Sequence, residues 1–260
     1  MSYSRFIVLG DSFSEGMSDE IINGNYRGWA DRVADVLAKQ NPDFRYANFA
    51  IRGKLVQQVH DDQIPHALPL IEGPHTLVSF HAGANDALRP NYDPERVRAT
   101  YTAAVEKLVN AGATVILFTV LEKNGKGGKA SAIWEERFSK FNQIVFSMGN
   151  KPNVIIMDAF MDPEAASPHM LAFDRLHLNP TGHYRVAQAV LETIGAPFDS
   201  SWKDPIVPPK KKPWIIRKGL SFLWIVTFAL PWIWRRIRGR SSGDGRSGKY
   251  TSLTTWPVAH

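Results

Sequence analysis

A serine, an aspartate and a histidine stand at spacings that suit nucleophilic catalysis. Ser12 follows the apolar run Phe6–Leu9 through a Gly-Asp turn. A strand that ends in such a turn can hold the serine hydroxyl at the edge of a sheet, where a nucleophile is needed. His177 comes three residues after Asp174, close enough for the carboxylate to fold back onto the imidazole and fix its tautomer. The pattern predicts that His177 takes the proton of Ser12 and that Asp174 orients His177.

Two further residues could stabilise the negative oxygen that such an attack creates. Asn85 follows the apolar run Thr76–Phe80, and its side-chain amide could donate a hydrogen bond to an oxyanion. Gly53 lies in the segment Asn48-Phe-Ala-Ile-Arg-Gly and could present its backbone amide. Each residue also has a purely structural interpretation: Asn85 suits an Asx turn, Gly53 a turn with positive φ, and Ser12 a capped turn.

The four segments together resemble the GDSL or SGNH hydrolase family over roughly residues 4–195. The resemblance implies that Ser12 is the nucleophile and that its amide forms the oxyanion hole with Gly53 and Asn85. It also implies that His177 is the general base, oriented by Asp174, and that no cofactor is needed. Phe13 stands where the family name expects leucine, at a position for apolar packing.

Polar neighbours of these residues are assigned structural roles. Ser14 is expected to cap the local turn, and Asp11 and Asp86 to brace loops by accepting backbone hydrogen bonds. His81 could line the pocket, but it is expected instead to fill the end of its strand, and His183 is expected to pack or to be solvated.

Short apolar runs alternate with helical patterns along the first 198 residues. The runs Phe6–Leu9, Phe44–Phe49, Thr76–Phe80, Thr114–Val120 and Val154–Met157 suit strands buried on both faces. Helices are expected around 29–37, from Pro94 to about Asn110, over roughly 132–148 and after Asn179. The alternation predicts an α/β fold, a three-layer α/β/α sandwich with a central parallel sheet of about five strands. Ligands of such sheets bind at the carboxyl ends of the strands, where Ser12 and Asn85 are expected.

Composition excludes several classes of protein. The chain contains no cysteine, so a disulfide framework, a thiolate zinc site and a cysteine nucleophile are impossible. Metal-ligand spacing and nucleotide-binding glycine motifs are also absent, and no metal or cofactor is predicted. The N-terminus lacks the pattern of a secretory signal, which favours the cytoplasm.

The positive charge is concentrated at the C-terminal end. Residues 201–260 hold twelve Lys or Arg and two Asp, a net charge of +10 that leaves −4 for residues 1–200. The mildly acidic body argues against nucleic-acid binding. The expected organisation is a hydrolase domain at 1–198, a Pro/Lys-rich linker at 199–213, an apolar, Trp-rich helix with basic flanks at 214–240, and a disordered tail at 241–260.

Three placements remain open for the helix at 214–240. Its four tryptophans and basic flanks suit the membrane interface, and a peripheral position at the inner membrane surface is the alternative to a freely cytoplasmic protein. The helix could also dock on the domain or on a partner. Its sixteen uncharged residues, 219–234, are short for a membrane span.

The sequence thus predicts a serine hydrolase that cleaves small-molecule or lipid carboxylic esters through an acyl-serine intermediate. An acyltransferase or a polysaccharide deacetylase could use the same residues. A non-catalytic, membrane-associated binding module is the alternative from another class, and the presence of Ser12, Asp174 and His177 argues against it.

Overall fold

The central sheet has five parallel strands and one antiparallel strand at its edge. The computed structural model describes residues 2–122, 129–208 and 213–257. The strands lie in the order β7-β6-β5-β1-β4-β8, and β8 pairs antiparallel with β4. Their bounds are β1 (Arg5–Gly10), β4 (Arg45–Asn48), β5 (Thr76–His81), β6 (Thr114–Phe118), β7 (Val154–Met157) and β8 (Tyr250–Thr255). The strands β2 (Ile21–Ile22) and β3 (Asn25–Tyr26) form a separate hairpin.

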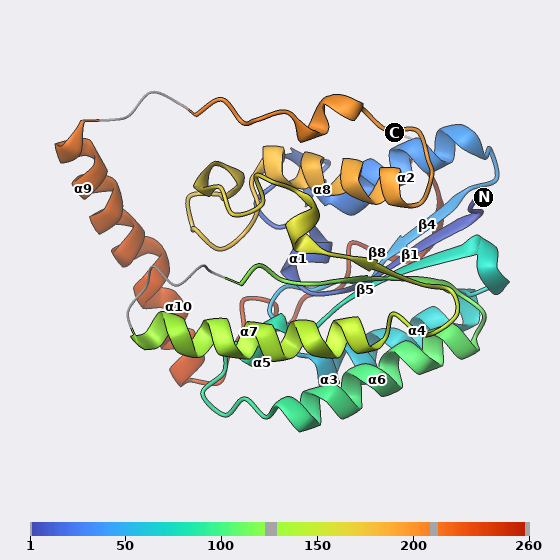
Figure 1. Cartoon of the computed structure of the whole chain (residues 1–260), viewed down its shortest axis with the longest axis horizontal. Coiled ribbons are helices and arrows are strands. Elements are labelled where there is room, and N and C mark those ends of the chain that lie inside the picture. Colours follow the sequence, from blue (N-terminus) through green and yellow to red (C-terminus); the bar gives the residue numbers. More distant parts are fainter. Residues whose placement is uncertain (1, 123–128, 209–212, 258–260) are drawn as a thin grey trace.

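Helices cover both faces of the sheet, as the α/β/α prediction requires. Figure 1 shows α2 and α8 on one face and α6 and α7, with the short helices α3 and α4, on the other. The longer helices are α2 (Gly28–Gln40), α6 (Pro94–Asn110), α7 (Lys129–Ser147) and α8 (Pro180–Thr193). The short turns near the site are α1 (Ser12–Glu15), α3 (Val56–Gln58), the π-helical turn η1 (Val59–Gln63), α4 (Ile64–Ala67) and α5 (Ala84–Ala87). Four short 3₁₀ turns lie elsewhere in the first 170 residues: η2 (Leu68–Leu70), η3 (Gly73–His75), η4 (Ala159–Met161) and η5 (Pro168–Met170).

The alternation of side chains along β1 builds two separate cores. Phe6 and Val8 belong to the core beneath α2 and α8, together with Trp29. Ile7 and Leu9 belong to the core beneath α6 and α7. All of these side chains are fully buried, so β1 lies at the centre of the molecule and its carboxyl end is held on both faces.

Gly10 closes β1 at a place where any larger residue would collide. Its φ is +141°, and a β-carbon there would run into the carbonyl oxygen of His81 on β5. The buried Gln63 side chain accepts from the Gly10 amide at 2.8 Å and donates to the Gly10 carbonyl at 2.9 Å. The residue before the Asp-Ser turn is thereby fixed in position.

The expectation of a disordered tail at 241–260 is wrong for residues that the structure describes. β8 adds to the sheet beside β4, and Lys249, just before it, forms a buried ion pair of 2.7 Å with Asp31 on α2. The Trp256 indole donates to Asp35 at 2.7 Å. The sequence does not predict this strand, because its Thr/Ser-rich run is half exposed and follows a Ser/Gly-rich segment.

The predicted boundary after residue 198 also requires correction. The 3₁₀ turn η6 (Ser200–Lys203) places Trp202 against α8, where the side chain is only 1 % exposed. Its indole nitrogen donates to Glu192 at 3.2 Å. The residues assigned to a linker therefore begin as part of the folded body.

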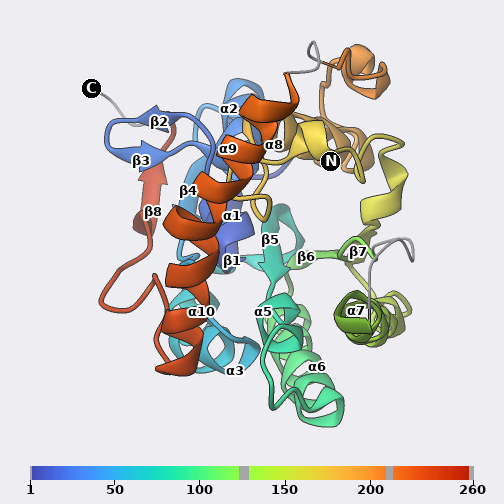
Figure 2. The same ribbon diagram turned by 90° about the vertical axis from the view of Figure 1, so that its left-hand side faces the viewer.

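A helical segment then crosses the carboxyl ends of the strands. It consists of α9 (Trp214–Trp224), the π-helical turn η7 (Ile225–Ala229) and α10 (Leu230–Ile237). Figure 2 shows α9 and α10 running in front of β1 and β4 before the chain returns to form β8. The expected apolar C-terminal helix is present, and it lies on the edge where the site was predicted.

Candidate active site

Ser12 is the first residue of α1, directly after β1. The preceding Asp11 caps this short helix, because its carboxylate accepts a hydrogen bond of 3.1 Å from the Phe13 amide. Ser12 is half-buried and faces a cavity, whereas Ser14 on the same turn is buried. The expectation that Ser14 caps the turn is wrong, since Asp11 takes that role.

Asp174 and His177 are joined as the sequence predicted. The Asp174 carboxylate accepts a hydrogen bond of 2.7 Å from His177 Nδ1. It also accepts hydrogen bonds from the backbone amides of Leu176 at 2.9 Å and His177 at 3.0 Å. Arg175 adopts φ +59°, which turns the loop back on itself so that these contacts can form. Burial raises the pKa of Asp174, but the hydrogen bonds and the His177 ring outweigh it and hold the pKa below its ordinary value. An ionised Asp174 fixes the proton on Nδ1, which leaves Nε2 as the acceptor.

Gly53 and Asn85 come from two different loops to the same cavity. Gly53 has φ +75°, and a β-carbon there would collide with the Ser241 hydroxyl. Asn85 lies in α5, and its Nδ2 donates to Asp11 at 2.9 Å and to the Lys54 carbonyl at 3.2 Å.

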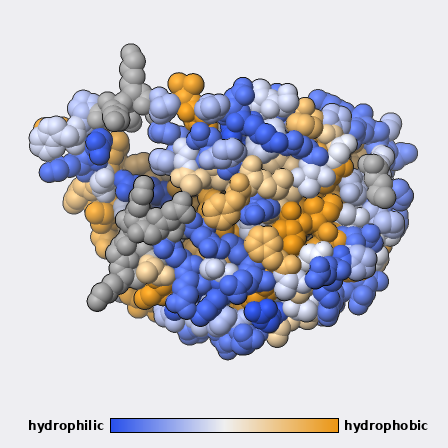
Figure 3. All heavy atoms as spheres, viewed as in Figure 1, coloured by the Kyte–Doolittle hydropathy of each residue, from blue (hydrophilic) through white to orange (hydrophobic). Residues whose placement is uncertain are grey.

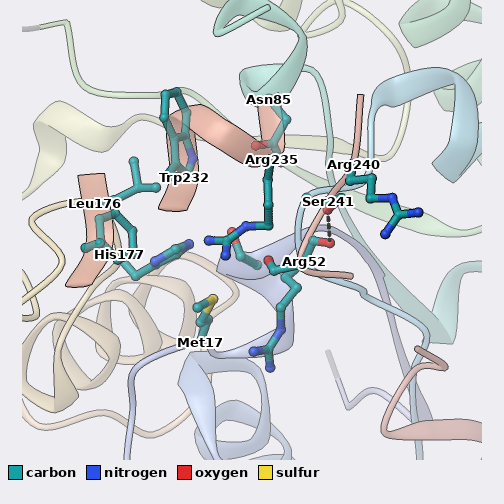
Figure 4. Close-up of a pocket in the computed structure, with 13 residues that line it drawn as sticks. Met17, Arg52, Asn85, Leu176, His177, Trp232, Arg235, Arg240 and Ser241 are labelled. Atoms are coloured by element: carbon teal, nitrogen blue, oxygen red, sulfur yellow. Dashed lines mark hydrogen bonds between the residues drawn. The ribbon is translucent and has the colours of Figure 1, made fainter. Parts of the chain in front are cut away.

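These residues converge on one cavity of about 70 Å³. Ser12, Gly53, Asn85 and His177 line it, and Asp174 stands behind His177. Figure 4 shows the His177 ring and the Arg235 guanidinium pointing toward one another, with Arg52 on the far side. The full lining is Ser12, Met17, Arg52, Gly53, Asn85, Leu176, His177, Phe228, Trp232, Arg235, Arg240, Ser241 and Ser242.

Several residues that hold this site in place were missed by sequence reasoning. Glu15 on α1 forms an ion pair with Arg52 and accepts the Arg52 amide at 2.6 Å, which ties the Gly53 loop to the Ser12 helix. Gln63 braces Gly10 from a helix that the sequence did not resolve. No local pattern marks such pairs, because each partner is chosen by the tertiary fold.

Asp11 and Asp86 accept backbone hydrogen bonds that hold loops in place, as expected, and Asp11 also contacts two other side chains near the site. Besides capping α1, Asp11 accepts from Asn85 and lies 3.3 Å from the buried His81 ring. Asp86 accepts from the Val56 amide at 3.0 Å, and burial raises the pKa of Asp86 to about 6.

The two other histidines near the site have the expected structural roles. His81 packs against the Phe13 ring at the end of β5, as expected, and it also contributes to the wall of the second cavity described below. His183 is buried and donates from Nε2 to the Met17 carbonyl at 3.1 Å. Burial lowers the pKa of His183 to about 4.

A second, more apolar cavity of about 270 Å³ adjoins the first and shares Leu176 with it. Phe13, which follows Ser12, and Phe118 at the end of β6 contribute to its wall. The lining of this cavity suits an apolar group. Within the ranges that the structure describes, no group of three or more His, Asp or Glu is placed to hold a metal ion.

Comparisons with known proteins show the family to which the chain belongs. The model of the GDSL-like lipase/acylhydrolase family matches residues 8–185, more than half of the chain. The chain belongs to this family, and it is a carboxylic ester hydrolase. A search of curated proteins gives no match.

Solved structures of two esterases and of a further hydrolase share the fold. The psychrotrophic esterase EstA from Pseudoalteromonas sp., inhibited by monoethylphosphonate, is 22 % identical with a TM-score of 0.55, covering 74 % of this chain and 97 % of that one. Axe2, an acetylxylan esterase from Geobacillus stearothermophilus, is 19 % identical with a TM-score of 0.59, covering 76 % and 97 %. LAE5, an alpha/beta hydrolase enzyme from the metagenome of Lake Arreo, is 19 % identical with a TM-score of 0.57, covering 74 % and 95 %.

Proposed function

We propose that the protein cleaves carboxylic esters through an acyl-serine intermediate, with Ser12, His177 and Asp174 as the catalytic triad. The observation that carries the proposal is the 2.7 Å contact between Asp174 and His177 Nδ1, on a loop whose histidine lines the same cavity as Ser12. A histidine held in this way keeps Nε2 free to accept a proton.

In the first half of the reaction, the Ser12 oxygen bonds to the ester carbonyl carbon while its proton passes to His177 Nε2. The carbonyl oxygen becomes an oxyanion, which the amides of Ser12 and Gly53 and the Asn85 side chain stabilise. The tetrahedral species then breaks the bond to the alcohol oxygen, which takes the proton from His177. The ionised Asp174 stabilises the imidazolium that exists between these two proton transfers.

In the second half, water repeats these steps on the acyl-serine. His177 takes a proton from the water, the new bond forms to the acyl carbon, and Ser12 regains its proton as the acid leaves. An apolar acyl or alkyl group fits the neighbouring cavity of about 270 Å³, which favours lipid or acyl esters over fully polar ones.

The decisive variant is Ser12→Ala. We expect hydrolysis of p-nitrophenyl esters to fall by roughly 10³-fold or more, with labelling by a fluorophosphonate probe lost as well. Ser14→Ala is the matched control, because Ser14 stands on the same turn but is buried. A folded Ser12→Ala protein with activity within tenfold of the parent would overturn the assignment. A panel of graded acyl chains then reports the substrate range, and product analysis with added alcohol distinguishes hydrolysis from acyl transfer.

A further inference from the structure

The helical segment α9–η7–α10 is fixed to the proposed catalytic loop by its inner face. The Trp224 indole donates to the Asp174 carbonyl at 2.9 Å. The Arg175 guanidinium lies 4.7 Å from the centre of the Trp224 ring and donates to the Ser221 hydroxyl at 3.1 Å. These contacts join the segment directly to the loop that carries His177.

The same face supplies a wall of the catalytic cavity. Phe228, Trp232 and Arg235 line the cavity, at helical spacing after Trp224. These residues lie beyond residue 185, where the family match ends. The segment is therefore part of the active-site entrance in this chain.

The opposite face of the segment is apolar and exposed. Phe222 is 68 % exposed and Ile237 73 % exposed, although both side chains are large and apolar. Figure 3 shows hydrophobic side chains along the flank where Figure 1 places α9 and α10. The exposed stripe, spaced by three, four or seven residues, is Ile215, Phe222, Val226, Leu230, Ile233 and Ile237. Such a patch marks an interaction surface.

The positive charge around the segment indicates an anionic partner for the exposed stripe. Between Asp204 and Asp244 the sequence contains nine Lys or Arg and no acidic residue. At one end of the segment Lys218 lies over the Trp214 ring at 5.0 Å, and at the other Arg238 lies over the Trp234 ring at 4.4 Å. Tryptophans paired with cations at both ends of an apolar stripe suit the boundary between acyl chains and anionic headgroups.

The topology rules out a segment that crosses the bilayer. In the described ranges, Trp214–Arg235 is the one helix long and apolar enough to span a membrane. However, β8 begins at Tyr250 and pairs with β4 of the body, so the chain after Arg235 must return to the same side within fourteen residues. That return would carry arginines and unpaired backbone through the hydrocarbon. A segment of this topology that binds a membrane must therefore lie in the plane of the interface.

We propose that the exposed face of α9–η7–α10 binds an anionic phospholipid surface and presents the catalytic cavity to ester lipids in that surface. The proposed binding to the phospholipid surface is supported by the exposed apolar stripe, the basic charges and the chain topology. The substrate class rests additionally on the proposed function.

The test compares the intact chain with a variant of the exposed stripe, Phe222→Gln/Val226→Gln/Leu230→Gln. Ile133→Gln/Phe146→Gln is the matched control, because these apolar residues are exposed on α7, away from the segment. Binding is measured by co-sedimentation with vesicles of phosphatidylcholine alone or with phosphatidylglycerol, at low and high salt. We expect the parent and the control to bind the anionic vesicles, more weakly at high salt, and the stripe variant to bind at least tenfold more weakly.

The remaining outcomes are also informative. A parent that stays in the supernatant, or a stripe variant that binds as the parent does, overturns the proposal. A parent that forms a dimer which the stripe variant loses, without vesicle binding, assigns the face to a second copy instead. Resistance to extraction by alkaline carbonate would mean a true span and contradict the interfacial placement.

The variant Ser12→Ala tests the proposed catalytic function independently of vesicle binding. We expect this variant to bind vesicles as the parent does, while hydrolysis of an ester lipid in them is lost. If Ser12→Ala keeps its hydrolysis, the catalytic assignment fails and the surface binding stands. If the parent binds vesicles but cleaves only soluble esters, the lipid-substrate part of the proposal is wrong.

Discussion

At the level of single residues, one carboxylate organises the loop that holds the base. Asp174 accepts from the Leu176 and His177 amides with one oxygen and from the imidazole with the other. Its depressed pKa means that the stabilisation from its charge is present above the ordinary pKa of aspartate and is lost as pH falls through the depressed value. At neutral pH the base is therefore oriented without any proton moving to Asp174.

Asn85 is the residue whose role is most open to measurement. We expect Asn85→Ala to lower kcat by roughly 10²–10³, the loss typical of one oxyanion donor, with little change in KM. The Asn85 amide donates to Asp11 at 2.9 Å and to the Lys54 carbonyl at 3.2 Å, so its position is fixed before substrate arrives. Because the amide has only two N–H groups, it must exchange one of these hydrogen bonds for the one to the oxyanion.

The control for this variant is its stability. Because Asp11 loses a donor when Asn85 is replaced, unfolding in urea must show that the variant is folded under assay conditions. A change in KM with kcat intact would place Asn85 in substrate binding instead of oxyanion stabilisation.

At the level of elements, the sequence predicts what local pattern decides. The five parallel strands carry apolar runs, and α6 and α8 begin at Pro94 and Pro180, each capped by the residue before. The motifs near Ser12 and His177 were found because their residues are close in sequence. Strand β8 has no apolar run, because it is a half-exposed edge strand, and no local pattern links it to its partner β4 some 200 residues earlier in the chain. Braces such as Gln63 and the Glu15–Arg52 pair were missed for the same reason.

Besides its pairing with β4, β8 is joined to the body by the ion pair of Lys249 with Asp31. Both side chains are buried, and Asp31 also accepts from the Tyr46 hydroxyl at 2.7 Å. Burial raises the pKa of Asp31 to about 6, and Lys249 opposes the rise. We expect Lys249→Met to reduce the free energy of unfolding by about 3 kcal/mol at pH 7.5, because it leaves a buried carboxylate without its cation.

The pH dependence of this variant distinguishes charge from packing. A carboxyl whose folded-state pKa is raised holds a proton more tightly in the folded protein, so its contribution to stability falls as pH rises toward the folded value. The loss of unfolding free energy caused by Lys249→Met should therefore be smaller at pH 5 than at pH 7.5. The double variant Asp31→Asn/Lys249→Met should recover much of that free energy, because it has no buried carboxylate at this position. Equal losses at both pH values in urea denaturation would contradict this explanation.

At the level of the whole molecule, the C-terminal part of the chain passes over the sheet edge that carries the candidate active site and then rejoins the sheet. After η6 it crosses the carboxyl ends of the strands as α9–η7–α10 and returns to the sheet as β8. The strongly basic segment thereby lies over the cavity of a body that carries a net charge of −4. The apolar helix is joined to the body through Ser221 and Trp224, and the chain after it returns to the sheet, so it is not a free appendage.

This topology predicts that residues 1–197 do not form an autonomous domain. Truncation after Pro197 removes Trp202, β8 and the cation of Asp31, and it leaves β4 as an unpaired edge. We expect the truncated protein to lose roughly 5 kcal/mol or more, to unfold at least about 10 °C lower and to aggregate through the exposed strand. Thermal unfolding and light scattering of the truncated and full chains measure both effects. A truncated protein as stable and monomeric as the parent would show that the C-terminal segment contributes nothing to the fold. Because truncation disturbs the body itself, side-chain variants of the exposed stripe are the sounder test of surface binding.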